Sequence, residues 1–306
     1  MIILLTYQQD YIIIYTLQKV KGEKMAIKIL IDSASDITLE EAKEYGIELI
    51  SMYINIDGKE YLDAVDIKGT EFYEKLAKCN EIPKTSLITP NRFFDKFNEM
   101  TANGDQVIAI TMSSKLSGTY NSACLAAEDF EGQVYVVDSM SVAGGERILC
   151  EYALNVLKEN LTIKEIVDKL NKEKVKINVF TIIDTLKYLK KGGRLSTIAA
   201  IAGEILFVKP IMTVYDGVIK ELGKAIGSRK AFNLLNKLIG NRGGVDYNKP
   251  YCLMWSGTDD SAVKKYINES KDFLKELANN IKSHLVGSII GTHVGPGVVG
   301  FAFFEK

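Results

Sequence analysis

The stretch QVIAITMSSKLSGTYNSA, residues 106–123, places a strand, a polar turn and the start of a helix in direct succession. Its first six residues form a nearly continuous apolar run, which is typical of a strand covered on both faces in a parallel sheet. The turn that follows carries several hydroxyl side chains and a single glycine, Gly118. Such a turn could be only a helix cap, or it could hold an anion against free backbone N–H groups.

The same succession of strand, polar turn and helix recurs through the first half of the chain. The helix predicted at 37–46 begins with a capping-box pattern, Thr38 followed by Glu41, and ends at Gly46. Apolar strand candidates flank these helices, at residues 27–32, 46–56, 106–112 and 133–139. Alternating strands and helices predict an α/β fold whose first domain is a doubly wound, mainly parallel sheet.

The second half has a different pattern. It offers helices at 161–174 and 197–206, a basic turn at 185–196, and a hairpin through Asp216-Gly217, which is a strong hairpin signal. Further strands are predicted at 177–184, 251–257, 284–294 and 297–306. We therefore predict a second α/β domain, a mixed sheet with helices, over 161–306, after a first domain at 25–160.

Composition excludes several classes of protein. The 306 residues carry a net charge of −1, so no basic excess calls for nucleic acid or an anionic membrane surface. The four cysteines are widely spaced and form no zinc pattern. We expect reduced thiols in a cytoplasmic protein without metal or cofactor.

Residues 1–24 differ from the rest, because short apolar runs alternate there with polar breaks. Neither run approaches the roughly 20 residues that a membrane-spanning helix needs, and the pattern is not that of a signal peptide. Our hypothesis is that Met25 is the true start, or that 1–24 form a loosely attached extension. The alternative is an additional strand or helix.

Hydroxyl-rich turns at 32–36, 111–120 and 138–145 follow first-domain strands, and a further one at 85–89 precedes a helix starting with Pro90. Ligands bind at this edge of an open α/β sheet, so the clusters together indicate a site for a small anionic group. Ser and Thr are also ordinary helix caps.

Known catalytic motifs are missing from the chain. There is no phosphate-binding P-loop and no nucleophile elbow, and GPGVVG at 295–300 precedes no helix, so it is no dinucleotide fingerprint. His293, flanked by glycines at the end of a predicted strand, and Arg194, in a basic turn, are candidates for a site or for ordinary structural roles.

Taken in order, seven motifs resemble those of the DegV family from about Met25 to the C-terminus. They are ILIDSASD, PKTSLITP, TMSSKLSGTYNSA, VYVVDSMS, LKKGGRLS, VKPIM and GTHVGPGVVGF. This family consists of bacterial fatty-acid-binding proteins that include the lipid-carrying subunits of fatty acid kinase. The chain departs from the family pattern at Leu87, where glutamine is common, and at Val294.

The resemblance implies two α/β domains with a long-chain, palmitate-like fatty acid held between them. Carried onto this chain, it implies that Thr85 and Ser117 hydrogen-bond the carboxylate and that His293 stands close by, with Arg194 near the site and the kinase-docking face. A separate ATP-using kinase subunit would then phosphorylate the carboxylate, so this chain would be a lipid-binding protein and not an enzyme.

Three alternatives remain open from the residues alone. The chain could be a hydrolase that uses Ser117 with His293, a phosphate-handling enzyme with a compact polar pocket, or a scaffold that holds lipid incidentally.

Overall fold

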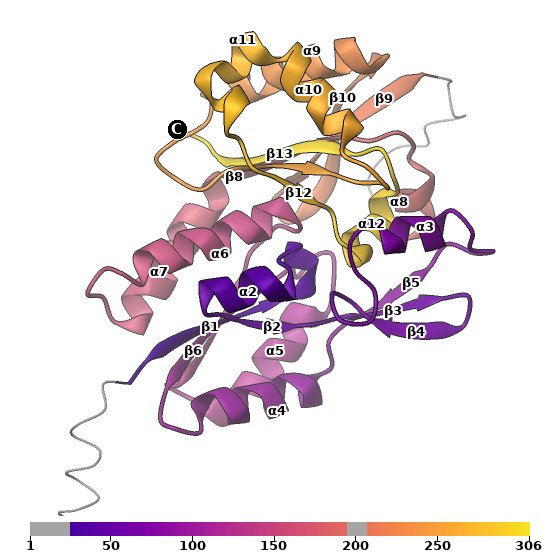
Figure 1. The fold of residues 1–306 in the computed structure, drawn as a ribbon. Coiled ribbons are helices and arrows are strands. Elements are labelled where there is room, and N and C mark those ends of the chain that lie inside the picture. The colour runs from indigo at the N-terminus through magenta and orange to yellow at the C-terminus, as the bar shows by residue number, and fades with distance from the viewer. Residues whose placement is uncertain (1–24, 195–206) are drawn as a thin grey trace, which may run out of the picture.

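A computed structural model describes residues 25–194 and 207–306. The predicted extension at 1–24 and the predicted apolar helix at 197–206 lie outside the described residues. Within them the chain forms a four-stranded sheet, a six-stranded sheet and a small three-stranded sheet. Figure 1 shows the four-stranded sheet in the lower half of the molecule and the six-stranded sheet in the upper half, with α6 between them.

The four-stranded sheet is fully parallel, in the order β2-β1-β6-β7. Its strands are β1 (Ile27–Asp32), β2 (Glu48–Ile50), β6 (Gln106–Thr111) and β7 (Val134–Asp138). Its helices are α2 (Leu39–Tyr45), α4 (Pro90–Thr101), α5 (Thr119–Ala127), α6 (Gly144–Val156) and α7 (Ile163–Glu173). Ile29 and Ile108 face α6 and α7, whereas Leu30 and Ala109 face α4 and α5, so the predicted doubly wound arrangement is confirmed.

The six-stranded sheet is mixed, in the order β10-β9-β8-β13-β11-β12. Its strands are β8 (Ile177–Ile182), β9 (Val208–Tyr215), β10 (Val218–Ile226), β11 (Cys252–Trp255), β12 (Ser283–Leu285) and β13 (Val299–Phe304). The associated helices are α8 (Lys187–Lys191), α9 (Ser228–Asn241), α10 (Ser261–Glu269), α11 (Lys271–Leu274) and α12 (Ser288–Val294). Phe180 and Phe301 pack against α9 and α10 on one face, and the other face turns toward α6.

Several local predictions are confirmed. Thr38 and Glu41 form the capping box of α2, and Gly46 ends that helix in the left-handed conformation. The β9–β10 hairpin turns at Asp216 and Gly217, whose positive φ angles of 51° and 72° are those of the tight hairpin turn. These features depend on neighbours in sequence, so a local pattern is sufficient to predict them.

Three predictions of elements were wrong. The strand expected at 46–56 is divided between β2 in the parallel sheet and β3 (Tyr53–Ile56), which pairs with β4 (Lys59–Leu62) and β5 (Lys84–Ser86) in the small sheet. The strand expected at 284–294 is only β12, and its second part is the helix α12. The basic turn contains the short helix α8.

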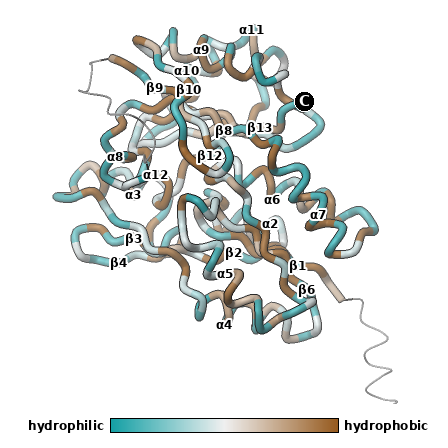
Figure 2. The backbone as a smooth tube through the Cα atoms, turned by 180° about the vertical axis from the view of Figure 1, so that it is seen from behind, coloured by the Kyte–Doolittle hydropathy of each residue, from teal (hydrophilic) through white to brown (hydrophobic). Residues whose placement is uncertain are grey.

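Helix α6 joins the two larger sheets. A side chain at Gly144 would lie 2.5 Å from Met254 Sδ, and one at Gly145 would lie 2.4 Å from Val179 Cγ2, so only glycine lets the six-stranded sheet come this close. Figure 2 shows apolar segments concentrated in the strands on both sides of this contact. The boundary at residue 160 stays a prediction, and α7 beyond it packs Ile166 against the first sheet.

Candidate functional site

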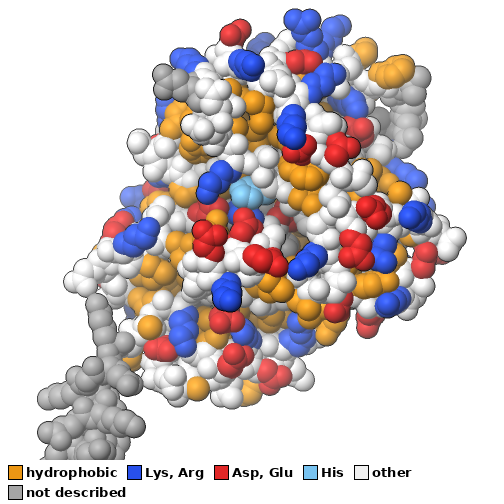
Figure 3. Space-filling view, viewed as in Figure 1, with side chains coloured by type: hydrophobic (Ala, Val, Ile, Leu, Met, Phe, Trp, Pro, Cys, Tyr) orange, Lys and Arg blue, Asp and Glu red, His pale blue; other side chains and the backbone are white. Residues whose placement is uncertain are grey.

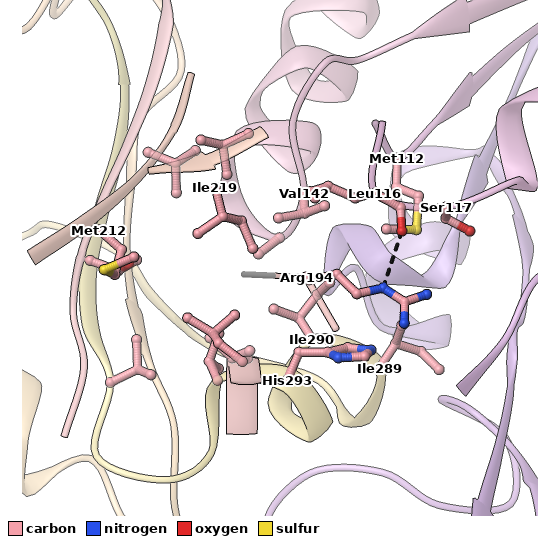
Figure 4. A pocket seen from close by; sticks show the side chains of 18 of the residues that line it. Met112, Leu116, Ser117, Val142, Arg194, Met212, Ile219, Ile289, Ile290 and His293 are labelled. Atoms are coloured by element: carbon pink, nitrogen blue, oxygen red, sulfur yellow. Dashed lines mark hydrogen bonds between the residues drawn. The ribbon is translucent and has the colours of Figure 1, made fainter. Parts of the chain in front are cut away.

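A pocket lies between the two larger sheets, and α12 forms one of its walls. It encloses about 920 Å³ including its opening to solvent, and most of the side chains that line it are apolar. Figure 4 shows Ser117, Arg194 and His293 gathered at one end and Met212 at the other. The four predicted site residues Thr85, Ser117, Arg194 and His293 all line this pocket.

Thr85 and His293 are in direct contact although 208 residues separate them in sequence. Thr85 is the middle residue of the three-residue strand β5, and His293 lies in the last turn of α12. Thr85 Oγ1 and His293 Nε2 are 3.1 Å apart. His293 Nδ1 is buried without a partner, which favours the tautomer with hydrogen on Nε2, because a buried donor without an acceptor is costly. In this tautomer the Thr85 hydroxyl accepts from His293 and keeps its own proton for a ligand.

The imidazole of His293 is neutral at neutral pH. Burial and the nearby charge of Arg194 lower its pKa to about 4. A neutral imidazole is a hydrogen-bond donor and not a fixed counter-charge to an anion. Gly192 packs against the other edge of the ring, since a side chain there would lie 2.3 Å from His293 Nδ1.

Ser117 lies in the turn that opens α5. Its Oγ accepts a hydrogen bond from the Thr119 N–H at 3.2 Å and lies 2.9 Å from Thr119 Oγ1. The hydroxyl therefore helps to cap the helix while it lines the pocket. The sequence left two roles open for the turn at 111–120, a helix cap or an anion site. The Ser117 hydroxyl bonds to the first residue of α5 and also lines the pocket, so it is compatible with both roles.

Arg194 supplies positive charge at the same end. Its Nη1 donates to Gly192 O at 2.6 Å, and its Nε donates to Leu116 O at 3.3 Å. The exposed guanidinium is therefore held by a backbone carbonyl of its own turn and by one from the turn before α5. In Figure 4 it lies between His293 and Ser117.

Four methionines in the pocket wall were not predicted from the sequence. Met52, Met112, Met212 and Met254 come from four separate segments, and no local pattern relates them. Methionine is unbranched and flexible, so it adapts to irregular apolar shapes. Together with isoleucine, leucine and valine side chains they make the pocket wall largely apolar, and Figure 4 shows Met112 beside Ser117 and Met212 at the opposite end.

Comparison with known proteins agrees with this arrangement. A family model described as "Uncharacterised protein, DegV family COG1307" matches residues 26–306. The chain belongs to the DegV family. It is 37% identical over 284 residues to the DegV domain-containing protein TTE1491 of Caldanaerobacter subterraneus subsp. tengcongensis, covering 92% of this chain and 99% of that protein.

Solved DegV structures share the fold. One, titled "Fatty Acid Binding of a DegV family Protein from Thermus thermophilus", has a TM-score of 0.80 at 28% identity and covers 92% of this chain and 100% of that one. Another is titled a stearic acid-binding protein from Eubacterium ventriosum, with a TM-score of 0.77 at 25% identity, covering 92% of this chain and 98% of that one. The family resemblance and the fold class inferred from the motifs are therefore confirmed.

In this DegV chain, hydroxyls of two of the four predicted clusters bond to nearby backbone groups, although Val142 and Ala143 of the 138–145 turn line the pocket. Ser33 Oγ accepts from Met52 N, and Ser35 Oγ donates to Asp32 O. Ser139 Oγ donates to Ser141 O. These hydroxyls satisfy buried backbone groups, which is the ordinary structural role that the sequence left open for each cluster.

Buried carboxyl groups near the first sheet were also not predicted. Asp32, Asp36, Asp63 and Glu146 are all buried, and burial raises the pKa of Asp32 and Asp63 to about 6 and that of Asp36 to about 8. Both carboxyl oxygens of Glu146 lack a partner, and burial raises its pKa well above the usual range. Among the described residues, no group of three or more side chains is arranged to hold a metal ion.

No helix in the described part of the chain is long and apolar enough to cross a membrane. The face shown in Figure 3 carries acidic and basic side chains intermixed.

Proposed function

We propose that the protein binds one long-chain fatty acid, with its carboxylate at the Thr85–Ser117–His293 end of the pocket and its acyl chain along the apolar remainder. The observation that carries the proposal is the asymmetry of the pocket: its few polar side chains, Ser117, Arg194 and His293 among them, gather at one end, and most of the remaining wall is aliphatic or methionine. Solved relatives whose titles name fatty acid binding support the same ligand class.

The polar end suits a carboxylate because it offers donors. The Thr85 hydroxyl, polarised by the His293 N–H, and the Ser117 hydroxyl would each donate to a carboxylate oxygen. Arg194 adds a positive charge at the opening. An unpaired buried carboxylate is costly, so these donors make burial of the head group possible without a close ion pair.

The apolar walls would supply most of the affinity. Burial of about 15 methylenes at about 0.8 kcal/mol each gives roughly 12 kcal/mol, from which the entropy lost on binding is subtracted. A ligand held in this way is expected to remain bound during purification.

Denaturing extraction followed by mass spectrometry of the purified protein tests the proposal directly. Fatty acid near one equivalent per chain is the expected result, and the chain lengths recovered would define the preference. Protein that is empty, and that also fails to take up added fatty acid, would remove this function and favour the phosphate-handling alternative.

We further propose that the bound carboxylate is presented to a separate ATP-using fatty acid kinase subunit in the cytoplasm. The chain would act there as a carrier without cofactor of its own. The resemblance to lipid-carrying subunits and the exposed Arg194 beside the carboxylate end support this step. Incubation of the loaded protein with candidate kinase subunits and labelled ATP should yield acyl phosphate only when both chains are present.

The hydrolase alternative is disfavoured by geometry. Ser117 Oγ bonds to Thr119, whereas His293 Nε2 contacts Thr85, so no hydrogen bond joins Ser117 to His293. The compact polar pocket of a phosphate-handling enzyme does not match walls built from methionine and branched aliphatic residues. If this chain alone hydrolysed a long-chain ester, the hydrolase function would be favoured again.

A further inference from the structure

Helix α12 is central to the pocket. Ile289, Ile290, His293 and Val294 from this seven-residue helix all line the cavity, and so does Val286 just before it. Figure 4 shows Ile289, Ile290 and His293 pointing into the space that the ligand would fill. The position of α12 therefore determines both the donor at the polar end and one apolar wall.

The N-terminus of α12 is held by groups from the first half of the chain. Its own N-cap residue, Gly287, has no side chain to cap with. Instead, Gly287 N–H donates to Asp36 Oδ1 at 2.8 Å, and Ser288 Oγ donates to Asp63 Oδ1 at 2.5 Å. These contacts span 251 and 225 residues of sequence.

A third contact comes from α3 (Glu71–Leu76). Tyr73 Oη donates to Val286 O at 2.7 Å. The same helix approaches α12 so closely that a side chain at Gly291 would lie 2.6 Å from Tyr73 Oη and 2.7 Å from Phe72 Cε1. Helix α12 is thus fixed at its start by hydrogen bonds and along its length by close packing.

All three anchoring side chains are buried. Asp36, Asp63 and Tyr73 are 9%, 4% and 3% exposed, so solvent does not compete strongly for their hydrogen bonds. The anchors therefore favour one position of α12, and hence of His293 opposite Thr85.

We propose that Asp36, Asp63 and Tyr73 are positioning residues of the ligand site, which act through α12 and do not touch the ligand. This inference rests on the proposed function only for its effect on affinity. Its geometric part, the placement of His293, can be tested without any fatty acid.

The main variant is Ser288→Ala, which removes one anchoring hydroxyl and leaves every pocket-lining side chain unchanged. Loss of one buried hydrogen bond should weaken fatty acid binding by delipidated protein about fivefold. It should also shift the NMR signal of the His293 imidazole in the ligand-free protein. The chain has only two histidines, so a His284→Gln variant identifies the His293 signal.

Ser270→Ala is the matched control. Ser270 is equally buried and accepts a hydrogen bond from Asn236 Nδ2 at 3.0 Å, between the helices on the far face of the six-stranded sheet. Both variants should lower the melting temperature, but only Ser288→Ala should change the affinity and the His293 signal. Tyr73→Phe removes another anchor while retaining the ring, and replaces Ser288→Ala if the latter does not fold.

The outcomes separate the two proposals. A wild-type protein that binds no fatty acid overturns the proposed function, and the His293 signal then still decides whether the anchors position α12. Unchanged affinity and an unchanged His293 signal in folded Ser288→Ala or Tyr73→Phe overturn the positioning role. If Ser270→Ala changed the affinity and the His293 signal as much as Ser288→Ala does, the effect would come from general loss of stability and the positioning role would be overturned.

Discussion

Replacement of Thr85 by valine tests the central contact of the proposed site. Valine has the shape of threonine and retains the branching that suits strand β5, so the change removes little more than the hydroxyl. The lost group is the one that accepts from His293 Nε2 at 3.1 Å and would donate to the fatty acid carboxylate. A hydrogen bond to a charged group contributes about 1.5–3 kcal/mol, which corresponds to roughly 10- to 150-fold weaker binding.

The assay is calorimetric titration of delipidated protein with a long-chain fatty acid, with the melting temperature measured in parallel. The matched control is Thr181→Val, in the same pocket. Thr181 lies on the cavity wall and pairs in the sheet with Met212, which Figure 4 places away from Ser117 and Arg194. We expect Thr181→Val to leave the affinity unchanged or slightly increased. Equal affinity in wild type and Thr85→Val, or an equal loss in both variants, would refute the assignment of the carboxylate end.

Three further predictions follow from the described contacts. Gly192→Ala should weaken binding with little change in melting temperature, because the added carbon would lie 2.3 Å from His293 Nδ1, whereas Gly240→Ala in α9 meets nothing within 4 Å and should leave the affinity unchanged. Arg147→Met should destabilise the fold by about 3 kcal/mol in urea titrations, because the buried guanidinium pairs with Glu41 at 2.6 Å and its loss leaves that charge uncompensated; an effect under about 1 kcal/mol would contradict this. The free energy of unfolding should fall as pH rises from 6.5 to 8, because burial raises the pKa of Asp36 to about 8 and the folded chain keeps a proton that the unfolded chain has lost. For this one group the slope is about 1.4 kcal/mol per pH unit near pH 6.5 and about half of that at pH 8, and Asp36→Asn should reduce it; an identical slope in the variant would argue against Asp36 as the cause.

Local chemistry was sufficient to predict much of the fold. The apolar runs that became β1, β6 and β7, the capping box of α2 and the hairpin at Asp216 and Gly217 all depend on neighbouring residues. Local patterns failed where a distant contact decided the outcome. Residues 288–294 are rich in β-branched side chains, yet they form a helix packed against α3, with its first turn held by Asp36 and Asp63.

The candidate site shows the same difference between what the sequence predicts and what distant contacts decide. The motif resemblance predicted Thr85, Ser117, Arg194 and His293, and the structure brings all four to one pocket, while their roles in ligand binding stay predictions. The resemblance implied that His293 stands near the carboxylate bound by Thr85, but it did not indicate that the two side chains touch. Nor did the sequence indicate that four methionines line one pocket or that Gly192 packs on the imidazole.

The sequence by itself determined the family, the α/β class and the residue types available for an anion, because these follow from local periodicity and ordered motifs. Only the tertiary structure decided which hydroxyls face the pocket and which satisfy buried backbone groups. It also decided the neutral state of His293 and the position of α12. These properties depend on burial and on contacts between residues more than 200 positions apart, which no local pattern specifies.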